Sequence, residues 1–196
     1  MEISSDFQNG KEEIVRVARR AVDMGLQSGM GGNISLRWGS HFLMKVSGRS
    51  LYGLTDADIV VVDANGKVQS GVGIPTKEVR LHLGIYRTRG DANGIVHYHA
   101  PFATAFAVKG IPITALTIHA RKNFPAMPVV PELEDGSEEL AAQAVGAFSD
   151  QEINLVLLAA HGLVAIGKTL DDAEALAELA EEAAKIALFA RLLGLP

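Results

Sequence analysis

Three histidines stand at the ends of apolar, strand-like segments, and together they could bind a metal ion. His97 and His99 follow one short apolar stretch, and His161 follows another. Residues two apart on a strand point to the same side, so the first two rings are expected to project together while Tyr98 points away. Three imidazoles with one open coordination position are typical of a catalytic zinc or similar divalent-metal site. The alternative is a polar strand face without metal, but burying three unpaired imidazoles would be costly.

Glu78 is the carboxylate that we expect beside this metal, on the first turn of a predicted helix. A carboxylate next to a Lewis-acidic metal can be a fourth ligand and then a base when substrate displaces it. The alternative is a glutamate that only favours the helix dipole. His82, one turn later, could be a further ligand, but we interpret it as structural because three histidines are already available. His119, near several prolines, is a candidate proton donor.

Two glycine-containing loops could bind an anion through their backbone N–H groups. One contains Gly31, Gly32 and Asn33, and the other contains Ser47 and Gly48. Thr76 and Lys77, which precede the glutamate, could add a hydroxyl donor and a cation. The simpler interpretation is that both loops are only turns and that the lysine is solvated. The candidate anion-binding residues are therefore Gly32, Asn33, Ser47, Gly48, Thr76 and Lys77.

The composition is that of a globular protein. Of the 196 residues 48% are hydrophobic, the net charge is −5 and there is no cysteine. No apolar stretch is long enough to span a membrane, and an acidic chain without basic runs argues against a nucleic-acid partner. Disulfides, thiolate metal sites and cysteine nucleophiles are excluded. The acidic and polar start of the chain is unlike a secretory signal, so we expect a cytoplasmic protein.

Sequence patterns divide the chain into helices and strands. Helices are predicted over residues 9–27, from 76 onward, and over 101–108, 138–148 and 170–193; strands are predicted over 34–38, 42–46, 58–63, 94–99, 155–160 and 163–166. Residues 111–131 carry four prolines and are predicted as a strand plus an ordered loop. No repeat or linker interrupts this order, which predicts one α/β domain over residues 1–196. The final helix has too few heptads for a coiled coil, so we expect it to cover the sheet or a subunit contact.

The order of these segments resembles the class II aldolase/adducin family over nearly the whole chain. The matching stretches are Gly31–Arg37, Val46–Gly48, Leu54–Val60, Thr76–His82, Ile95–Pro101 and Ala160–Leu163. Together they are highly specific, although any one of them alone would not be. The resemblance implies a three-layer α/β/α sandwich around a mainly antiparallel central sheet. It also implies a homotetramer with active sites at subunit interfaces.

The resemblance also assigns roles to the candidate site residues. His97, His99 and His161 match the family's zinc ligands, although imidazoles also bind Mn²⁺, Co²⁺ or Fe²⁺. Glu78 matches the family's ligand and acid/base, and a glutamate at that position favours carbon–carbon cleavage or dehydration over epimerisation. The six candidate anion-binding residues fall at phosphate-site positions.

The chain also departs from the family pattern. It has Met30-Gly31 where the aldolases have Thr-Ser, and Thr76-Lys77 where they have Ser-Ser. Leu116 stands near the position of the tyrosine that donates a proton, so His119 or Tyr98 would have to replace that donor.

We therefore expect a zinc-dependent aldolase that reversibly cleaves a small ketose 1-phosphate to dihydroxyacetone phosphate and an aldehyde. One alternative is a lyase that dehydrates a methylthioribulose-1-phosphate-like substrate. A second is a lyase that acts on a carboxylated sugar, because Lys77 suits a carboxylate as well as a phosphate. A non-catalytic scaffold, as in the adducin branch, is less favoured because all three histidines and Glu78 are present.

Overall fold

The computed structural model describes residues 7–124 and 127–194. Within these residues the strands form one eight-stranded sheet with the order β4-β3-β2-β1-β5-β8-β7-β6. The strands are β1 (Asn33–Trp38), β2 (His41–Lys45), β3 (Ile59–Val62), β4 (Val68–Ser70), β5 (Gly94–Tyr98), β6 (Val129–Val130), β7 (Leu155–Leu158) and β8 (Gly162–Gly167). All neighbours are antiparallel except β6 and β7, which are parallel. The predicted mainly antiparallel sheet is confirmed.

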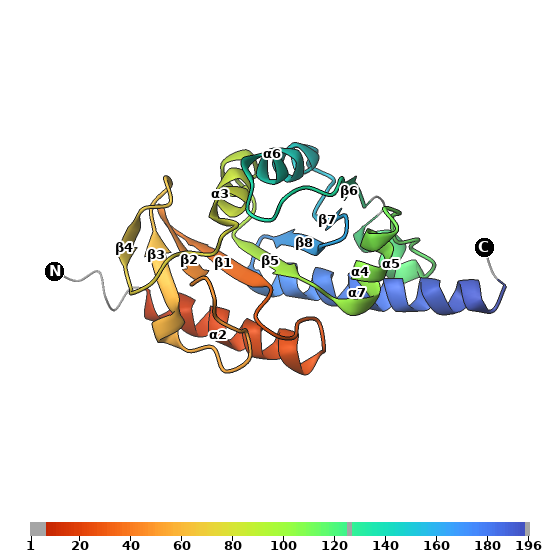
Figure 1. Cartoon of the computed structure of the whole chain (residues 1–196), viewed down its shortest axis with the longest axis horizontal. Helices are drawn as coiled ribbons and strands as arrows, with labels where there is room; N and C mark the ends of the chain where they lie inside the picture. The colour runs from red at the N-terminus through yellow and green to blue at the C-terminus, as the bar shows by residue number, and fades with distance from the viewer. Residues whose placement is uncertain (1–6, 125–126, 195–196) are drawn as a thin grey trace.

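Helices cover both faces of this sheet (Figure 1). They are α2 (Gln8–Asp23), α3 (Val79–Thr88), α4 (Pro101–Val108), α5 (Ile118–Asn123), α6 (Glu138–Ala147) and α7 (Leu170–Leu192), and a short 3-10 turn spans Asp56–Asp58. Helices α2, α4, α5 and α7 lie on one face, and α3 and α6 lie on the other. The three-layer α/β/α sandwich is therefore confirmed. None of the helices in the described part of the chain combines the length and the apolar character that a membrane span requires.

The sheet separates two hydrophobic cores, and β5 contributes side chains to both. Val96 and Tyr98 pack in the core beneath α7, whereas Ile95 packs in the core beneath α3 and α6. Because side chains alternate along a strand, His97 lies on the same side as Ile95. Strand β5 thus presents His97 on the α3/α6 face, while Val96 and Tyr98 anchor the strand to the opposite layer.

Strand register brings the separate site segments together. Asn33 on β1 pairs with His97 on β5, and His97 pairs with Val164 on β8. The β7–β8 hairpin pairs Leu158 with Gly162, so the turn that carries His161 closes at the same end of the sheet. Residues far apart in the sequence therefore meet at one end of the three central strands β1, β5 and β8.

Three predicted elements differ from the structure. The helix predicted over residues 9–27 spans Gln8–Asp23, and Gly25 takes a left-handed backbone conformation just after its end. The helix predicted to open at Thr76 begins only at Val79, because the Thr76 N–H donates to the Lys45 carbonyl at 3.1 Å and ties this backbone to β2. Glu78 is consequently the N-cap residue rather than part of the first turn. The segment 111–131 contains helix α5, whose first turn is capped by the Thr117 hydroxyl, and only a two-residue strand, β6.

Candidate metal centre and active site

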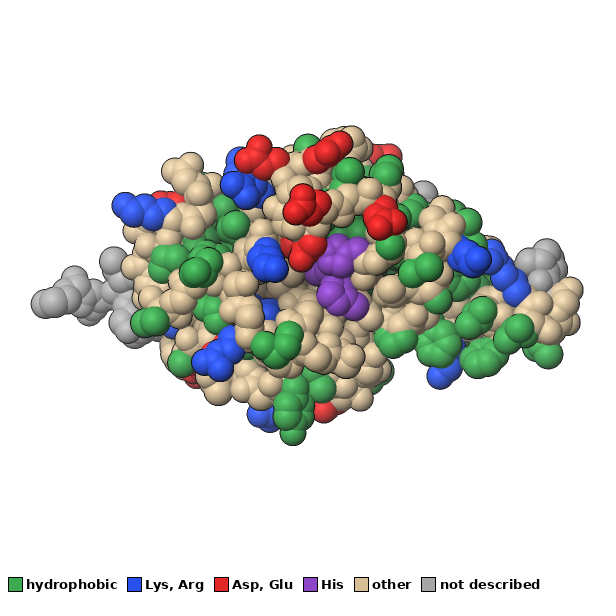
Figure 2. Space-filling model, in the orientation of Figure 1, with side chains coloured by type: hydrophobic (Ala, Val, Ile, Leu, Met, Phe, Trp, Pro, Cys, Tyr) green, Lys and Arg blue, Asp and Glu red, His purple; other side chains and the backbone are tan. Residues whose placement is uncertain are grey.

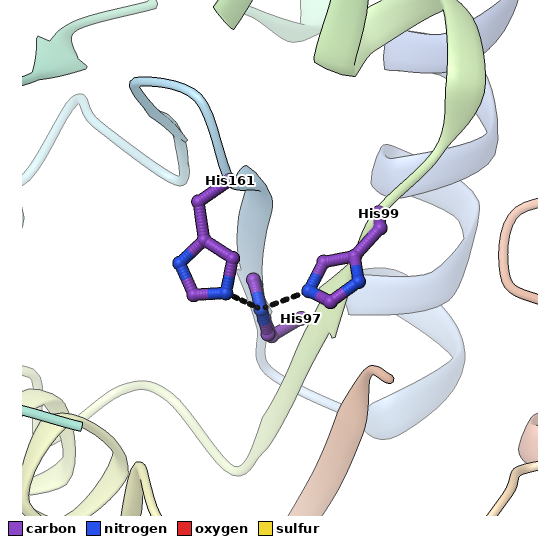
Figure 3. Close-up of side chains that lie close together, drawn as sticks. All are labelled: His97, His99 and His161. Atoms are coloured by element: carbon purple, nitrogen blue, oxygen red, sulfur yellow. Dashed lines mark hydrogen bonds between the residues drawn. The ribbon is translucent and has the colours of Figure 1, made fainter. Parts of the chain in front are cut away.

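The three predicted histidines converge on one point (Figure 3). His97 lies on β5, His99 follows it directly, and His161 lies in the turn between β7 and β8. The Nε2 atom of His97 is 3.2 Å from Nε2 of His99 and 3.3 Å from Nε2 of His161. Tetrahedral zinc with Zn–N bonds of 2.0–2.1 Å places its ligand nitrogens about 3.3 Å apart. The group could therefore hold one metal ion.

The protonation of these rings also fits a metal. His97 donates its Nδ1 proton to the Leu163 carbonyl at 2.9 Å, which directs the lone pair of its other nitrogen toward the two remaining rings. Burial and the neighbouring rings lower the pKa of His99 to about 4 and also lower the pKa of His161. Neutral imidazoles that face each other through lone pairs repel, and a cation between them removes that repulsion.

Glu78 lies beside the triad. It is 3% exposed, its Oε2 is 3.5 Å from Nε2 of His97, and its Oε1 is 3.9 Å from Nδ1 of His161. Oε1 has no hydrogen-bond partner among the described residues. An unpaired buried carboxylate oxygen is costly unless a cation faces it, so Glu78 is the second feature that fits a metal. Burial alone would raise the pKa of Glu78, but His97, the Asn33 amide and the other rings outweigh it and lower the pKa.

A buried chain of hydrogen bonds holds the other oxygen of Glu78. The side-chain amide of Asn33 donates to Oε2 at 2.7 Å, and its side-chain oxygen Oδ1 accepts from Nε2 of His82. Nδ1 of His82 contacts the Ser35 hydroxyl at 2.6 Å, which in turn contacts the Tyr86 hydroxyl at 2.9 Å. Burial lowers the pKa of His82 to about 4, so the ring is neutral and donates through Nε2. His82 is thus structural, as interpreted from the sequence, and Asn33 orients Glu78.

The candidate metal site opens onto one cavity of about 250 Å³. All six candidate anion-binding residues border it, together with the three histidines and Glu78. The histidine side chains are visible in the middle of one face of the molecule, beside acidic and basic side chains (Figure 2). The structure therefore brings together the metal-site and anion-site residues predicted from separate motifs.

Sequence reasoning missed two lining residues, Lys45 and Asp135. Lys45 on β2 is only 3% exposed, donates to the Arg49 carbonyl, and has its pKa lowered by burial. Asp135 is exposed, and its carboxylate lies within 4.8 Å of a Glu78 oxygen and a ring nitrogen of His161. The lysine next to Val46-Ser47-Gly48 was the available signal for the first, whereas nothing in the polar loop marked the second.

The backbone around His161 is tightly constrained. Ala160 has φ +55°, and it is the one non-glycine residue with positive φ in the described part of the chain. Such a conformation costs of order 1 kcal/mol and is characteristic of functional sites. On the other side of His161, a Cβ on Gly162 would lie 2.3 Å from the Tyr98 carbonyl oxygen. The turn thus depends on a strained alanine and on the absence of a side chain at Gly162.

Neither candidate proton donor lies in this cavity. Tyr98 is buried on the opposite face of the sheet and donates to Oε2 of Glu174 at 2.6 Å, so it cannot replace the donor. His119 is exposed on α5 and borders a different cavity of about 440 Å³. Leu116, at the position where the family pattern has tyrosine, packs against the core beneath α7.

Comparisons with known proteins agree with this architecture. Residues 12–188 match the family model described as the class II aldolase and adducin N-terminal domain. The chain is 34% identical to an L-fuculose phosphate aldolase of Methanocaldococcus jannaschii over 91% of its own length and 95% of the relative's. It is 32% identical to a 5-deoxy-D-ribulose 1-phosphate aldolase of Bacillus thuringiensis serovar kurstaki, over 97% and 89% respectively. A solved L-fuculose 1-phosphate aldolase superposes with a TM-score of 0.88 at 30% identity, covering 96% of this chain and 89% of that one.

Proposed function

The chain belongs to the class II aldolase/adducin family, and on that premise we propose that it is a zinc-dependent aldolase acting on a small ketose 1-phosphate. The products are dihydroxyacetone phosphate and an aldehyde, and the reaction is reversible. The observation that carries this proposal is the convergence of three imidazole nitrogens, with the buried Glu78 carboxylate beside them, in a cavity lined by candidate anion-binding residues. The similarity to two named sugar-phosphate aldolases supports the substrate class.

Each group in the cavity has a role in this reaction. His97, His99 and His161 would hold the ion, which would supply Lewis acidity at the substrate's carbonyl group. Glu78 accepts and returns the proton at the donor carbon, and the Asn33 amide fixes its orientation. The activation free energy is lowered because the reacting carbon is held next to the metal site and the Glu78 carboxylate.

The phosphate binds at the other end of the cavity. Gly32, Ser47, Gly48 and Thr76 offer backbone or hydroxyl donors, and Lys45 and Lys77 supply the positive charge. Burial lowers the pKa of Lys45, and its ammonium already donates to the Arg49 carbonyl, whereas Lys77 is exposed, so we assign Lys77 the stronger contribution.

We also propose that the protein is a homotetramer with its active sites at subunit interfaces. Apolar side chains near the cavity are widely exposed, among them Met30, Tyr52, Val72 and Ile74. The Ser47 N–H donates to the Ile74 carbonyl at 2.8 Å, which places the segment carrying Val72 and Ile74 beside the anion loop. Because His119 does not border the cavity of its own chain, it can donate a proton only from a neighbouring subunit.

Metal removal tests the proposed activity directly. Purified protein is assayed with L-fuculose 1-phosphate and 5-deoxy-D-ribulose 1-phosphate, with dihydroxyacetone phosphate measured by enzymatic reduction. We expect exhaustive chelation to abolish cleavage and one equivalent of Zn²⁺ per chain to restore it. Full activity after chelation would rule out the proposal, and a product that has lost water with its carbon skeleton intact would identify a dehydratase instead. Protein that binds no stoichiometric metal would indicate a scaffold.

A further inference from the structure

We propose that helix α7 positions the metal ligands through two inward-facing glutamates, Glu174 and Glu181. This inference rests on the proposed metal-dependent function. The two residues are seven positions apart, which is about two helical turns, so both face the same side of α7. Neither of them borders the metal cavity. They are positioning residues that act through the backbone of the segment carrying His97 and His99.

Glu174 anchors the residue between the two adjacent ligands. Tyr98 is fully buried, and its hydroxyl donates to Oε2 of Glu174 at 2.6 Å. Since Tyr98 projects to the α7 face, His97 and His99 project together to the opposite side. A shift of Tyr98 along or around the strand would therefore move both imidazoles at once.

Glu181 anchors the chain immediately after the ligands. Its two carboxylate oxygens accept the N–H groups of Phe102 at 2.9 Å and Ala103 at 2.8 Å, at the start of α4. The N-cap residue, Ala100, has no side chain that could do this. Glu181 therefore supplies from another helix the cap that α4 lacks, and it fixes the exit of the chain from His99.

The rest of the α7 surface is poorly suited to set this alignment. Its buried positions are mostly alanine: Ala173, Ala177, Ala180, Ala183, Ala184, Ala187 and Ala190. Small side chains permit close approach, and a Cβ on Gly94 would lie 2.4 Å from Cα of Leu170, at the point where β5 and α7 both begin. The ridges of an alanine-rich face are shallow, so the directional hydrogen bonds of Glu174 and Glu181 add to the close contact at Gly94 in setting the position of β5 along the helix.

The polar pair is retained at a cost in stability. Glu174 is 1% exposed, its Oε1 has no hydrogen-bond partner among the described residues, and burial raises its pKa to about 7. Replacing a buried polar pair by apolar side chains of similar size is often neutral or stabilising. A pair kept only for stability would not be expected here, whereas a pair that aligns two metal ligands would.

The test compares Zn²⁺ affinity, measured by competition with a chelating dye, with the free energy of unfolding of the metal-free protein. In Tyr98→Phe/Glu174→Leu we expect unchanged or higher stability and about tenfold weaker Zn²⁺ binding, the size of effect that outer partners of metal ligands commonly have. Glu174→Gln, which keeps an oxygen for the Tyr98 hydroxyl, should bind Zn²⁺ as the wild type does. Glu181→Ala should weaken binding independently, which keeps the proposal testable if the double variant does not fold.

Glu182→Leu is the matched control, because Glu182 lies on the exposed side of the same helix. Wild-type affinity in this control, combined with weaker binding in both inward-facing variants, supports the inference. Equal Zn²⁺ affinity in the wild type, the double variant and Glu181→Ala would overturn it. Wild-type protein that binds no Zn²⁺ would instead contradict the proposed function, so the two failures are distinguishable.

Discussion

At the scale of single residues, Glu78 is held at one carboxylate oxygen and unpaired at the other. The held oxygen ends the chain of hydrogen bonds through Asn33, His82 and Ser35, which fixes the plane of the carboxylate. The unpaired oxygen lies 3.9 Å from Nδ1 of His161, and the held oxygen lies 3.5 Å from Nε2 of His97. This asymmetry suits a group that must contact a metal in one step and a carbon-bound proton in another.

Glu78→Gln tests this role. We expect kcat for carbon–carbon cleavage to fall by about 100-fold or more, since the amide cannot accept the proton, while the three histidines still bind Zn²⁺. Steady-state kinetics and metal analysis of the same preparation measure both effects. Near wild-type kcat with full metal content would assign the proton transfer to another residue.

The buried Glu174 predicts a dependence of stability on pH. The pKa of Glu174 is raised from 4.5 to about 7 by burial and by Glu178, against opposing contributions from Tyr98 and Arg20, while Asp171 raises it further. Because the folded pKa exceeds the unfolded one, the bound proton adds stability below about pH 4.5 that is lost as the pH rises through 7. This contribution is of order 3 kcal/mol.

Glu174→Gln should remove that dependence while keeping an acceptor for Tyr98. The free energy of unfolding of the variant relative to wild type is therefore expected to increase between pH 4.5 and 7.5. Urea denaturation of the metal-free proteins at several pH values measures it. A difference in the free energy of unfolding that stays constant across these pH values would show that Glu174 does not titrate in this range.

At the scale of elements, the close approach of β8 to the end of β5 positions His161. Gly162→Ala is expected to destabilise the protein by about 1–3 kcal/mol and to weaken Zn²⁺ binding, because the new Cβ would clash with the Tyr98 carbonyl oxygen. Gly146→Ala in α6 is the matched control, since no atom lies within 4 Å of the added Cβ. The control should be neutral or more stable by roughly 0.5–1 kcal/mol. Similar losses in both variants would refute the clash.

The sequence predicted elements better than it predicted the contacts between them. The period of two along a strand was enough to place His97 and His99 together, and apolar runs located β5 and β7. The start of α3 was wrong because the decisive hydrogen bond, from the Thr76 N–H to the Lys45 carbonyl, joins distant segments. Lys45 was missed for the same reason, since its burial depends on how β2 lies against the anion loop.

At the scale of the whole molecule, exposed apolar side chains predict self-association. Val72 is 87% exposed and Ile74 is 77% exposed, beside the cavity rim. Sedimentation velocity should give a mass about four times the 20.8 kDa of one chain. Val72→Asp/Ile74→Asp should shift the protein toward smaller species, because burying two carboxylates at an apolar contact is costly. A wild-type protein that sediments as a monomer would contradict the interfacial active site.

The proposed metal ligands lie on β5, directly after it, or in the β7–β8 turn, and two separate apolar cores hold these strands in place. Unlike a zinc finger, which collapses only around its ion, this chain has the means to fold first and acquire its ion later. When metal is scarce, the metal-free protein would then remain folded and able to bind an ion later, rather than being degraded. The ion that occupies the site would depend on which divalent metals are available, because an imidazole site binds several of them and folding does not select among them.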